Sequence, residues 1–317
     1  MKTATVAIGG NALLRSNEDG SIDNQRKNAE ETACHLVGLI EKGYDIVITH
    51  GNGPQVGAVL LQNEMGRNKV PSMPLDVCGA QTQGHIGYLL QQALNSRLRD
   101  AGLPHTAISL VTQVVVDEND AAFSNPTKFI GPFYEEEEAT KLSKAGWIMK
   151  EDPRGGYRRV VPSPEPKSIV EKEAIHHLIF GDSKTVVIAA GGGGVPVIER
   201  EGGHIGVEAV VDKDLATSVL ASSLGEELLI ILTDVAHVSK NFGREDEEPL
   251  HDLSCSDVRR LLDEGHFPSG SMGPKIKAAL RFLEKGGNKV LITSPERISD
   301  AMARKEGTWI TANGEKR

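Results

Sequence analysis

Glycine-rich loops follow three apolar runs of the chain, and their residues have the clearest chemical use. The loops are AIGGNALL at 7–14, THGNGPQVG at 49–57 and AAGGGGVPV at 189–197. Glycine lets the backbone come close to a ligand, and N–H groups at the end of a strand or the start of a helix bind anions, most often phosphates. The three loops therefore predict a cradle for a phosphate-like anion.

Two further segments place a lysine in the first turn of an expected helix. VVDKDLATS carries Lys213 between Asp212 and Asp214, and GSMGPKIKAAL carries Lys275. The helix dipole disfavours a cation there unless an anion compensates it, which favours lysines that face a phosphate and are oriented by a carboxylate. Helix capping alone is the alternative interpretation of the two acids, and Lys277 fits a solvated helix face.

A change of composition separates residues of about 118–170 from the rest of the chain. Prolines accumulate there, and NPTKFIGPFY at 125–134 and GYRRVVPSPEP at 156–166 carry basic residues that include Lys128. Such a stretch does not continue a regular βα alternation, so we expect an inserted subdomain or lid.

Several phosphate-binding motifs are absent from the sequence. GxxxxGK[ST] does not occur, and GNGPQVG has the spacing GxGxxxG, one residue longer than the dinucleotide pattern. The HRD and DFG motifs of protein kinases are missing as well. The histidines show no HxH or HExxH spacing, so we expect no tightly bound transition metal, and any Mg²⁺ should arrive with nucleotide phosphates.

The net charge and the cysteine content limit the possible binding partners and the cellular compartment of the protein. The formal charge of −9 argues against a nucleic-acid partner, which requires a broad basic surface. The 3 cysteines are widely spaced and form no CxxC pair, which favours a reducing compartment. We find neither a signal peptide nor a run long enough to span a bilayer, so we expect a cytoplasmic protein without a membrane partner.

The elements that must position these residues follow from the apolar pattern. The expected strands are 4–8, 45–49, 185–189, 228–232 and 289–293. Segments of helical period separate them, with inward stripes that include Ala29, Ala33, Leu36 and Ile40, and Ile276, Ala279, Leu280 and Leu283. This alternation predicts an α/β protein with a mainly parallel sheet covered on both faces.

Taken in order, the motifs resemble the amino acid kinase family along nearly the whole chain, and within it they are most similar to the carbamate kinase group. The resemblance also includes PLDVCGAQTQGHIGYLLQQAL at 74–94, LTDV at 232–235 and the glycine-rich loops. The pair NPTKFIGPFY and RRVVPSP is similar to the protruding subdomain of carbamate kinases.

The resemblance implies an open three-layer αβα sandwich in one domain, 1–317, with a small protruding subdomain. Its parts would be an acceptor-binding half of about 1–117, the protruding lid of about 118–170 and a nucleotide-binding half of about 171–317. The implied reaction is reversible phosphoryl transfer, ATP plus carbamate giving ADP plus carbamoyl phosphate, with Mg²⁺ accompanying the nucleotide. Such enzymes often run toward ATP in arginine or purine-derivative breakdown, and a homodimer is expected from the family.

Site residues follow from the resemblance motif by motif. Carbamate and the phosphoryl group would contact Gly9, Gly10, Asn11, Gly51, Asn52 and Gly53. The catalytic set would be Lys128, Lys213, Lys275 and, as organiser of the lysines, Asp214. The nucleotide would contact Gly192, Gly193, Gly194, Thr233, Asp234, Met272, Gly273 and Lys275.

Two alternatives stay open at this point. The acceptor of another amino acid kinase would be glutamate, acetylglutamate or UMP instead of carbamate. A regulator with the same fold could bind a nucleotide or an anion without catalysis, although such a protein has no need of the cations that stabilise a transition state.

Overall fold

The computed structural model describes residues 2–10, 13–15, 18–152, 155–181, 184–267 and 271–313. Within them, the five apolar runs expected to be strands all lie in one sheet of eight described strands. In spatial order these strands are β15 (Asp252–Ser254), β17 (Thr308–Thr311), β16 (Lys289–Thr293), β12 (Leu228–Leu232), β1 (Lys2–Ile8), β2 (Tyr44–His50), β9 (Thr185–Ile188) and β3 (Thr106–Ser109). Neighbours pair in parallel, except that β16 and β17 are antiparallel, so the predicted mainly parallel sheet is confirmed.

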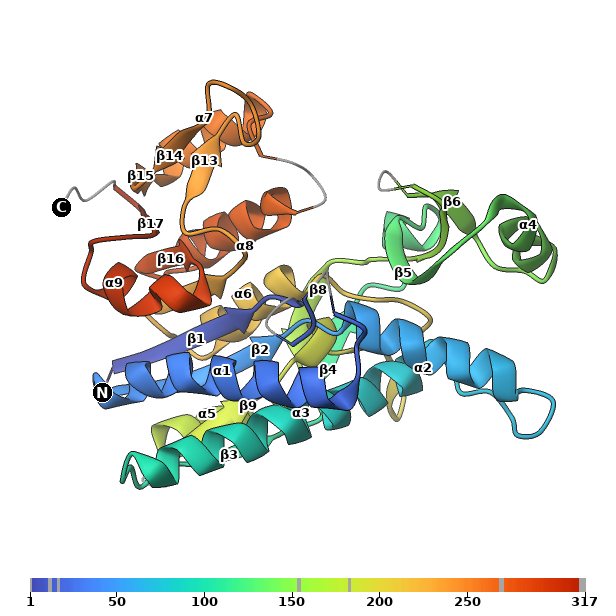
Figure 1. Ribbon diagram of the computed structural model, residues 1–317, viewed down its shortest axis with the longest axis horizontal. Coiled ribbons are helices and arrows are strands. Elements are labelled where there is room, and N and C mark those ends of the chain that lie inside the picture. Colours follow the sequence, from blue (N-terminus) through green and yellow to red (C-terminus); the bar gives the residue numbers. More distant parts are fainter. Residues whose placement is uncertain are drawn as a thin grey trace.

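Helices cover both faces of this sheet because its central strands are apolar on both sides. Val6 of β1 belongs to the core shared with α1 and α3, whereas its neighbour Ala7 belongs to the core shared with α7 and α8. Figure 1 shows α1 and α3 on one side of the strands and α8 on the other. The helices are α1 (Ile22–Glu41), α2 (Gly53–Gly66), α3 (Leu75–Asp100), α4 (Glu136–Lys144), α5 (Lys172–Phe180), α6 (Lys213–Ser223), α7 (Cys255–Asp263), α8 (Met272–Glu284) and α9 (Ile298–Met302). The arrangement is the predicted three-layer αβα sandwich.

The two predicted helical stripes are buried. In α1 the four residues of the stripe face the core, the Ser21 side chain caps the first turn, and Gly43 follows the helix with a positive φ of 83°. In α8 the stripe is equally buried, while Lys277 lies exposed on the opposite face. Both helices thus pack on the sheet through the apolar face that the helical period of the sequence predicts.

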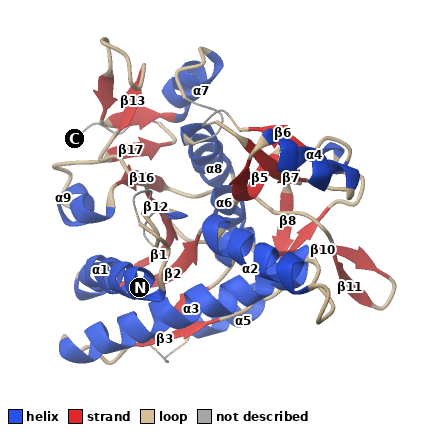
Figure 2. Ribbon diagram, turned by 45° about the vertical axis from the view of Figure 1, so that its right-hand side comes forward, coloured by secondary structure: helices blue, strands red, loops and turns tan. Residues whose placement is uncertain are grey.

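A small antiparallel sheet projects from the main body. It has the order β5 (Lys128–Tyr134), β7 (Tyr157–Val161) and β6 (Met149–Glu151), with α4 beside it. Figures 1 and 2 show this unit standing apart from the main sheet. We call β5, β7, β6 and α4 the lid.

The remaining strands form two smaller sheets. One has the order β11 (Gly203–Gly206), β10 (Val195–Arg200), β4 (Gln113–Val116) and β8 (Pro166–Ile169), and the other pairs β13 (Val238–Lys240) with β14 (Glu248–Leu250). Short 3₁₀ turns occupy Ala121–Phe123, Gly191–Gly193 and Pro295–Arg297. None of the helices in the described part of the chain combines the length and hydrophobicity that crossing a bilayer requires. Cys34, Cys78 and Cys255 are all free thiols, and Cys78 is buried in the core.

Candidate active site

A cavity of about 430 Å³ lies where the central strands end and three helices begin. Its lining includes the loops that follow β1, β2 and β12, the first residues of α2, α6 and α8, and the start of lid strand β5. All three helices direct the positive end of their dipole toward the cavity, and the first turns of α2 and α8 carry no side-chain cap. The fold therefore builds an anion site before any charged side chain is counted.

The first two glycine loops meet at the floor of the cavity. A Cβ atom on Gly51 would lie 3.3 Å from both Cα and N of Gly10, so these loops pack backbone against backbone. The Gly51 N–H donates to the Ile8 carbonyl at 3.2 Å, which ties the two loops together. Gly9, Gly10, Gly51 and Gly53 all line the cavity, whereas Asn11 lies outside the described residues.

Asn52 lines the same cavity but is anchored away from it. Its side-chain amide donates to Thr82 Oγ1 of α3 at 2.8 Å, and the residue is 7% exposed. A Cβ atom on Gly192 would lie 2.2 Å from Asn52 Nδ2, so the third glycine loop is seated directly on this amide. Asn52 therefore links the glycine loop after β2 to α3 and to the glycines after β9.

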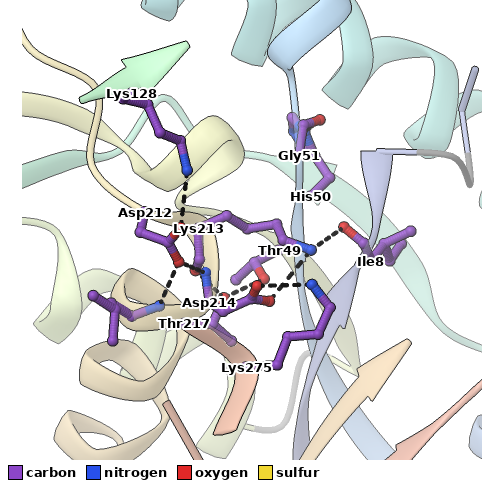
Figure 3. A network of polar contacts seen from close by, with 11 residues as sticks. Ile8, Thr49, His50, Gly51, Lys128, Asp212, Lys213, Asp214, Thr217 and Lys275 are labelled. Atoms are coloured by element: carbon purple, nitrogen blue, oxygen red, sulfur yellow. Dashed lines mark hydrogen bonds and ion pairs between the residues drawn. The ribbon is translucent and has the colours of Figure 1, made fainter. Parts of the chain in front are cut away.

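The centre of the site is one buried carboxylate between two lysines. Asp214 Oδ1 lies 3.3 Å from Lys213 Nζ, and Asp214 Oδ2 accepts a hydrogen bond from Lys275 Nζ at 3.1 Å. Lys213 Nζ also donates to the Ile8 carbonyl at 3.0 Å, which places its charge at the end of β1. Figure 3 shows both ammonium groups directed at Asp214. The lysines come from the first turns of α6 and α8, as the sequence predicts.

Burial and charge act against each other in this group. Burial disfavours the Asp214 carboxylate, but the attraction of Lys213 and Lys275 outweighs it and lowers the Asp214 pKa. Burial also lowers the pKa of Lys213, and the Asp214 charge opposes that shift. Asp214 thus remains ionised and supports the positive charge of its two lysines.

Lys128 reaches the cavity from the lid and has a different partner. Its Nζ donates to Asp212 Oδ2 at 2.9 Å. Asp212 also caps α6, because its Oδ1 accepts the backbone N–H groups of Asp214 at 3.0 Å and Leu215 at 3.3 Å. The capping interpretation of Asp212 is confirmed, but the sequence does not reveal its bond to Lys128, since 84 residues separate the partners.

The third glycine loop contributes mainly shape. Gly192 lines the cavity, whereas the N–H groups of Gly193 and Gly194 donate to the carbonyls of Ala190 and Gly191 at 3.1 and 3.0 Å. Both of these glycines have positive φ, and a side chain on Gly193 would collide with the Val211 carbonyl. The assignment of Gly193 and Gly194 as nucleotide contacts stays a prediction.

A second, more apolar cavity of about 170 Å³ adjoins the first. The two share Thr233, Asp234 and Ser271, and Met272 and Phe242 supply apolar walls. Gly273, at the start of α8, is buried. Thr233, Asp234 and Met272 therefore lie together, as predicted, beside the lysine cluster.

His50 ends β2, next to Gly51, but does not line either cavity. Its ring is buried, and burial lowers its pKa to about 4. The neutral ring donates from Nδ1 to the Gly51 carbonyl at 3.0 Å. His50 is thus a buried packing residue at the end of β2.

Within the described ranges, no three His, Cys, Asp or Glu side chains are grouped so as to hold a metal ion. The carboxyl groups of Asp212, Asp214 and Asp234 do line the main cavity, but Asp212 and Asp214 already face lysines. This donor set fits a hard cation that brings most of its own oxygen ligands, as Mg²⁺ does when phosphates bind it.

An αβα sandwich whose sheet ends in glycine loops, helix N-termini and converging lysines defines the class of kinases that phosphorylate small oxyanions. Residues 2–294 match the model of the amino acid kinase family, and the chain belongs to that family.

Curated relatives are similar over nearly the whole length. The chain is 47% identical to a carbamate kinase of Pyrococcus horikoshii over 309 residues, covering 96% of this chain and 98% of the relative. It is 48% identical to a carbamate kinase of Halobacterium salinarum over 314 residues, covering 98% of each. Among solved structures, carbamate kinase from Giardia lamblia bound to AMP-PNP superposes with a TM-score of 0.91 at 45% identity, again covering 98% of each chain.

Proposed function

We propose that this protein is a carbamate kinase, which transfers a phosphoryl group reversibly between ATP and carbamate. The observation that carries the proposal is the convergence of Lys128, Lys213 and Lys275 on one cavity floored by glycine loops. The similarity to carbamate kinases over nearly the entire chain supports carbamate as the acceptor.

The acceptor chemistry fits a site built from cations and backbone amides. Carbamate is already an oxyanion, so its attacking oxygen needs no general base. His50 is neutral, buried and directed at a backbone carbonyl, which agrees with a reaction that does not use it as a base. Carbamate would lie against Gly9, Gly10 and Gly51, where the loops after β1 and β2 meet.

Phosphoryl transfer requires alignment and neutralisation of charge on the migrating group. Lys213 lies at the end of β1 and Lys275 in the first turn of α8, and both are held by Asp214. These two lysines would neutralise the migrating group from the protein interior. Lys128 would do so from the lid. The three lysines outnumber the two carboxyl groups that they face, Asp212 and Asp214, so the site has an excess of basic side chains that a phosphoryl group would balance.

The nucleotide would extend from the lysine cluster into the second cavity. Met272, Phe242 and Val235 offer apolar surface for a flat base, and Thr233 and Ser271 connect that surface to the phosphate site. Mg²⁺ would enter with the nucleotide phosphates, near Asp234, and would supply further neutralisation of their charge.

Three finer points rest on the family resemblance. We propose that the enzyme works as a homodimer in the cytoplasm, and that it runs toward ATP in catabolism of arginine or of purine derivatives. Light scattering coupled to gel filtration tests the dimer, and the ratio of the rates in the two directions tests the preferred one.

The test of the proposed function is ATP formation by the purified protein from ADP, Mg²⁺ and carbamoyl phosphate, followed with a luciferase readout. We expect turnover with carbamoyl phosphate, and no ADP release in the forward direction with glutamate, acetylglutamate or UMP as acceptor. Turnover with one of these instead would assign another acceptor, and ADP binding without turnover would indicate a regulator.

A further inference from the structure

The three lysines of the site differ in how firmly they are held. The side chains of Lys213 and Lys275 are 13% and 14% exposed, whereas that of Lys128 is 37% exposed. Lys213 and Lys275 share Asp214 and are carried by helices of the main body. Lys128 begins a strand of the lid, so its position depends on what attaches the lid to the body.

One attachment lies between β5 and α2. A Cβ atom on Gly57 would lie 2.6 Å from Gly131 Cα, so the two backbones touch, and Gly131 has a positive φ of 75°. Arg158 of β7 supports this contact, because its Nε donates to the Gly131 carbonyl at 3.0 Å. This contact fixes the middle of β5, whereas Lys128 lies three residues earlier, at the beginning of the strand, where its backbone pairs with Val161 of β7.

The lid also packs against the body through Ile130 and Val161 and pairs Arg159 with Glu208. The attachment that reaches Lys128 itself is the carboxylate of Asp212. Its Oδ1 holds the first turn of α6, which carries Lys213 and Asp214, and its Oδ2 accepts the Lys128 ammonium. Figure 3 shows Lys128 extending from the lid to Asp212, next to the group around Asp214. A single side chain thus connects the lid cation to the helix that carries the other two charges of the site.

We propose that Asp212 is a positioning residue, whose carboxylate clasps Lys128 and keeps the lid strand β5 over the phosphoryl site before the anion binds. The inference rests on the proposed function. A clasp of this kind orders Lys128 in advance, so the entropy of ordering that long side chain is not lost again at the transition state. Its effect should therefore fall on kcat more than on KM.

The chain allows the clasp to be separated from the cap. In Asp212→Asn the amide oxygen still accepts the N–H groups at the start of α6, but the charge that holds Lys128 is gone. Asp212→Ser is a second variant with a capping oxygen and no charge. Each is made alone and together with Lys128→Met, and ATP formation from carbamoyl phosphate and ADP is measured.

We expect Asp212→Asn to lower kcat by about tenfold with a smaller change in the KM for carbamoyl phosphate. In the Lys128→Met background the same substitution should change kcat by less than about twofold, because the two residues act as one unit. An equal loss in both backgrounds would show that Asp212 acts independently of Lys128. Wild-type kcat in both the Asn and Ser variants, or a change confined to KM, would likewise overturn the clasp.

A readout without turnover separates this inference from the proposed function. Hydrogen exchange of the ligand-free protein should become faster in peptides of β5 and β7 in Asp212→Asn, with no change in β2. Unchanged exchange in the lid would refute the clasp even in an active enzyme. A different outcome is that the wild-type protein forms no ATP, while exchange in the lid is still faster in Asp212→Asn than in the wild type. That outcome would contradict the proposed function but not the clasp.

Discussion

Asp214 gives the most informative perturbation, because one carboxylate supports two lysines. Asp214→Asn keeps the size and shape of the side chain but removes the negative charge. The change leaves Lys213 and Lys275 close together, in a place where burial already lowers the pKa of Lys213. We expect loss of both stability and turnover.

The distances set the scale of the effect. Unit charges separated by the observed 3.1 and 3.3 Å attract by about 5 kcal/mol per pair at an effective dielectric constant of about 20. The cost of burying the three charges cancels much of this attraction, and removing one partner of a buried ion pair typically costs about 3–5 kcal/mol. For kcat we expect a loss of about 10²-fold or more, the usual result of weakening one electrostatic stabiliser.

The pH profile distinguishes this mechanism from simple misfolding. The Asp214 charge opposes the effect of burial on Lys213, so its removal lowers the Lys213 pKa further. Because the protonated lysine is the active form, the remaining activity of Asp214→Asn should rise as the pH is lowered, relative to that of the wild type. Initial rates of ATP formation across a pH series, with urea denaturation on the same samples, measure both effects.

Asp45 offers the matched control. It is a buried carboxylate at the opposite end of β2, paired with His105 at 3.4 Å and Lys184 at 3.9 Å. Asp45→Asn should cost stability without changing kcat or its pH profile. If Asp214→Asn turned over at the wild-type rate, or if its pH profile matched that of the wild type, the assigned role of Asp214 would be refuted.

Further substitutions test other parts of the site and the fold. Lys213→Ala and Lys275→Ala should each lower kcat by about 10²-fold or more, and near-wild-type turnover in both would contradict the cationic pocket. Gly57→Ala should reduce kcat/KM because its Cβ would displace β5 from α2. Gly38→Ala in α1 is the control, since a Cβ there meets no atom within 4 Å and should leave kcat/KM unchanged. Equal activities of the two variants would show that the contact between Gly57 and β5 does not matter for catalysis. Burial raises the pKa of Glu226, which accepts a hydrogen bond from Thr5, to about 8. The folded protein therefore keeps a proton that the unfolded chain releases near its ordinary pKa of 4.5, and stability falls as the pH rises through this window, by up to about 1.4 kcal/mol per pH unit. Glu226→Gln should flatten that slope in urea denaturation between about pH 5 and 8, and an unchanged slope would count against a protonated Glu226.

Local pattern was sufficient to predict much of the fold. The five expected strands and the stripes of α1 and α8 are set by apolar periodicity, which the chain carries in short segments. The place of β17, antiparallel to β16 and parallel to β15, has no such local signal. It depends on pairing with strands from two other parts of the chain, and that is a property of the whole molecule.

The same distinction holds for the site. Lys213 and Lys275 could be recognised because a lysine in the first turn of a helix opposes the dipole and needs a reason. Other features depend on residues that are distant in sequence, and the spacing of residues does not encode such contacts. They are the bond from Lys128 to Asp212, the contact of Gly57 with Gly131 and the burial of Glu226. Asp212 could be predicted as a cap, whereas its second oxygen acquires a partner only in the folded protein.

In the proposed reaction, three ammonium groups from different segments of the chain act on one phosphoryl group. The most direct test of this proposal is a crystal structure with ADP, Mg²⁺, carbamate and a planar metal-fluoride mimic of the migrating phosphoryl group. We predict that Nζ of Lys128, Lys213 and Lys275 will each lie within about 3.2 Å of the mimic. Any of the three ammonium groups lying beyond about 6 Å, too far for a bond through a single water molecule, would contradict the account.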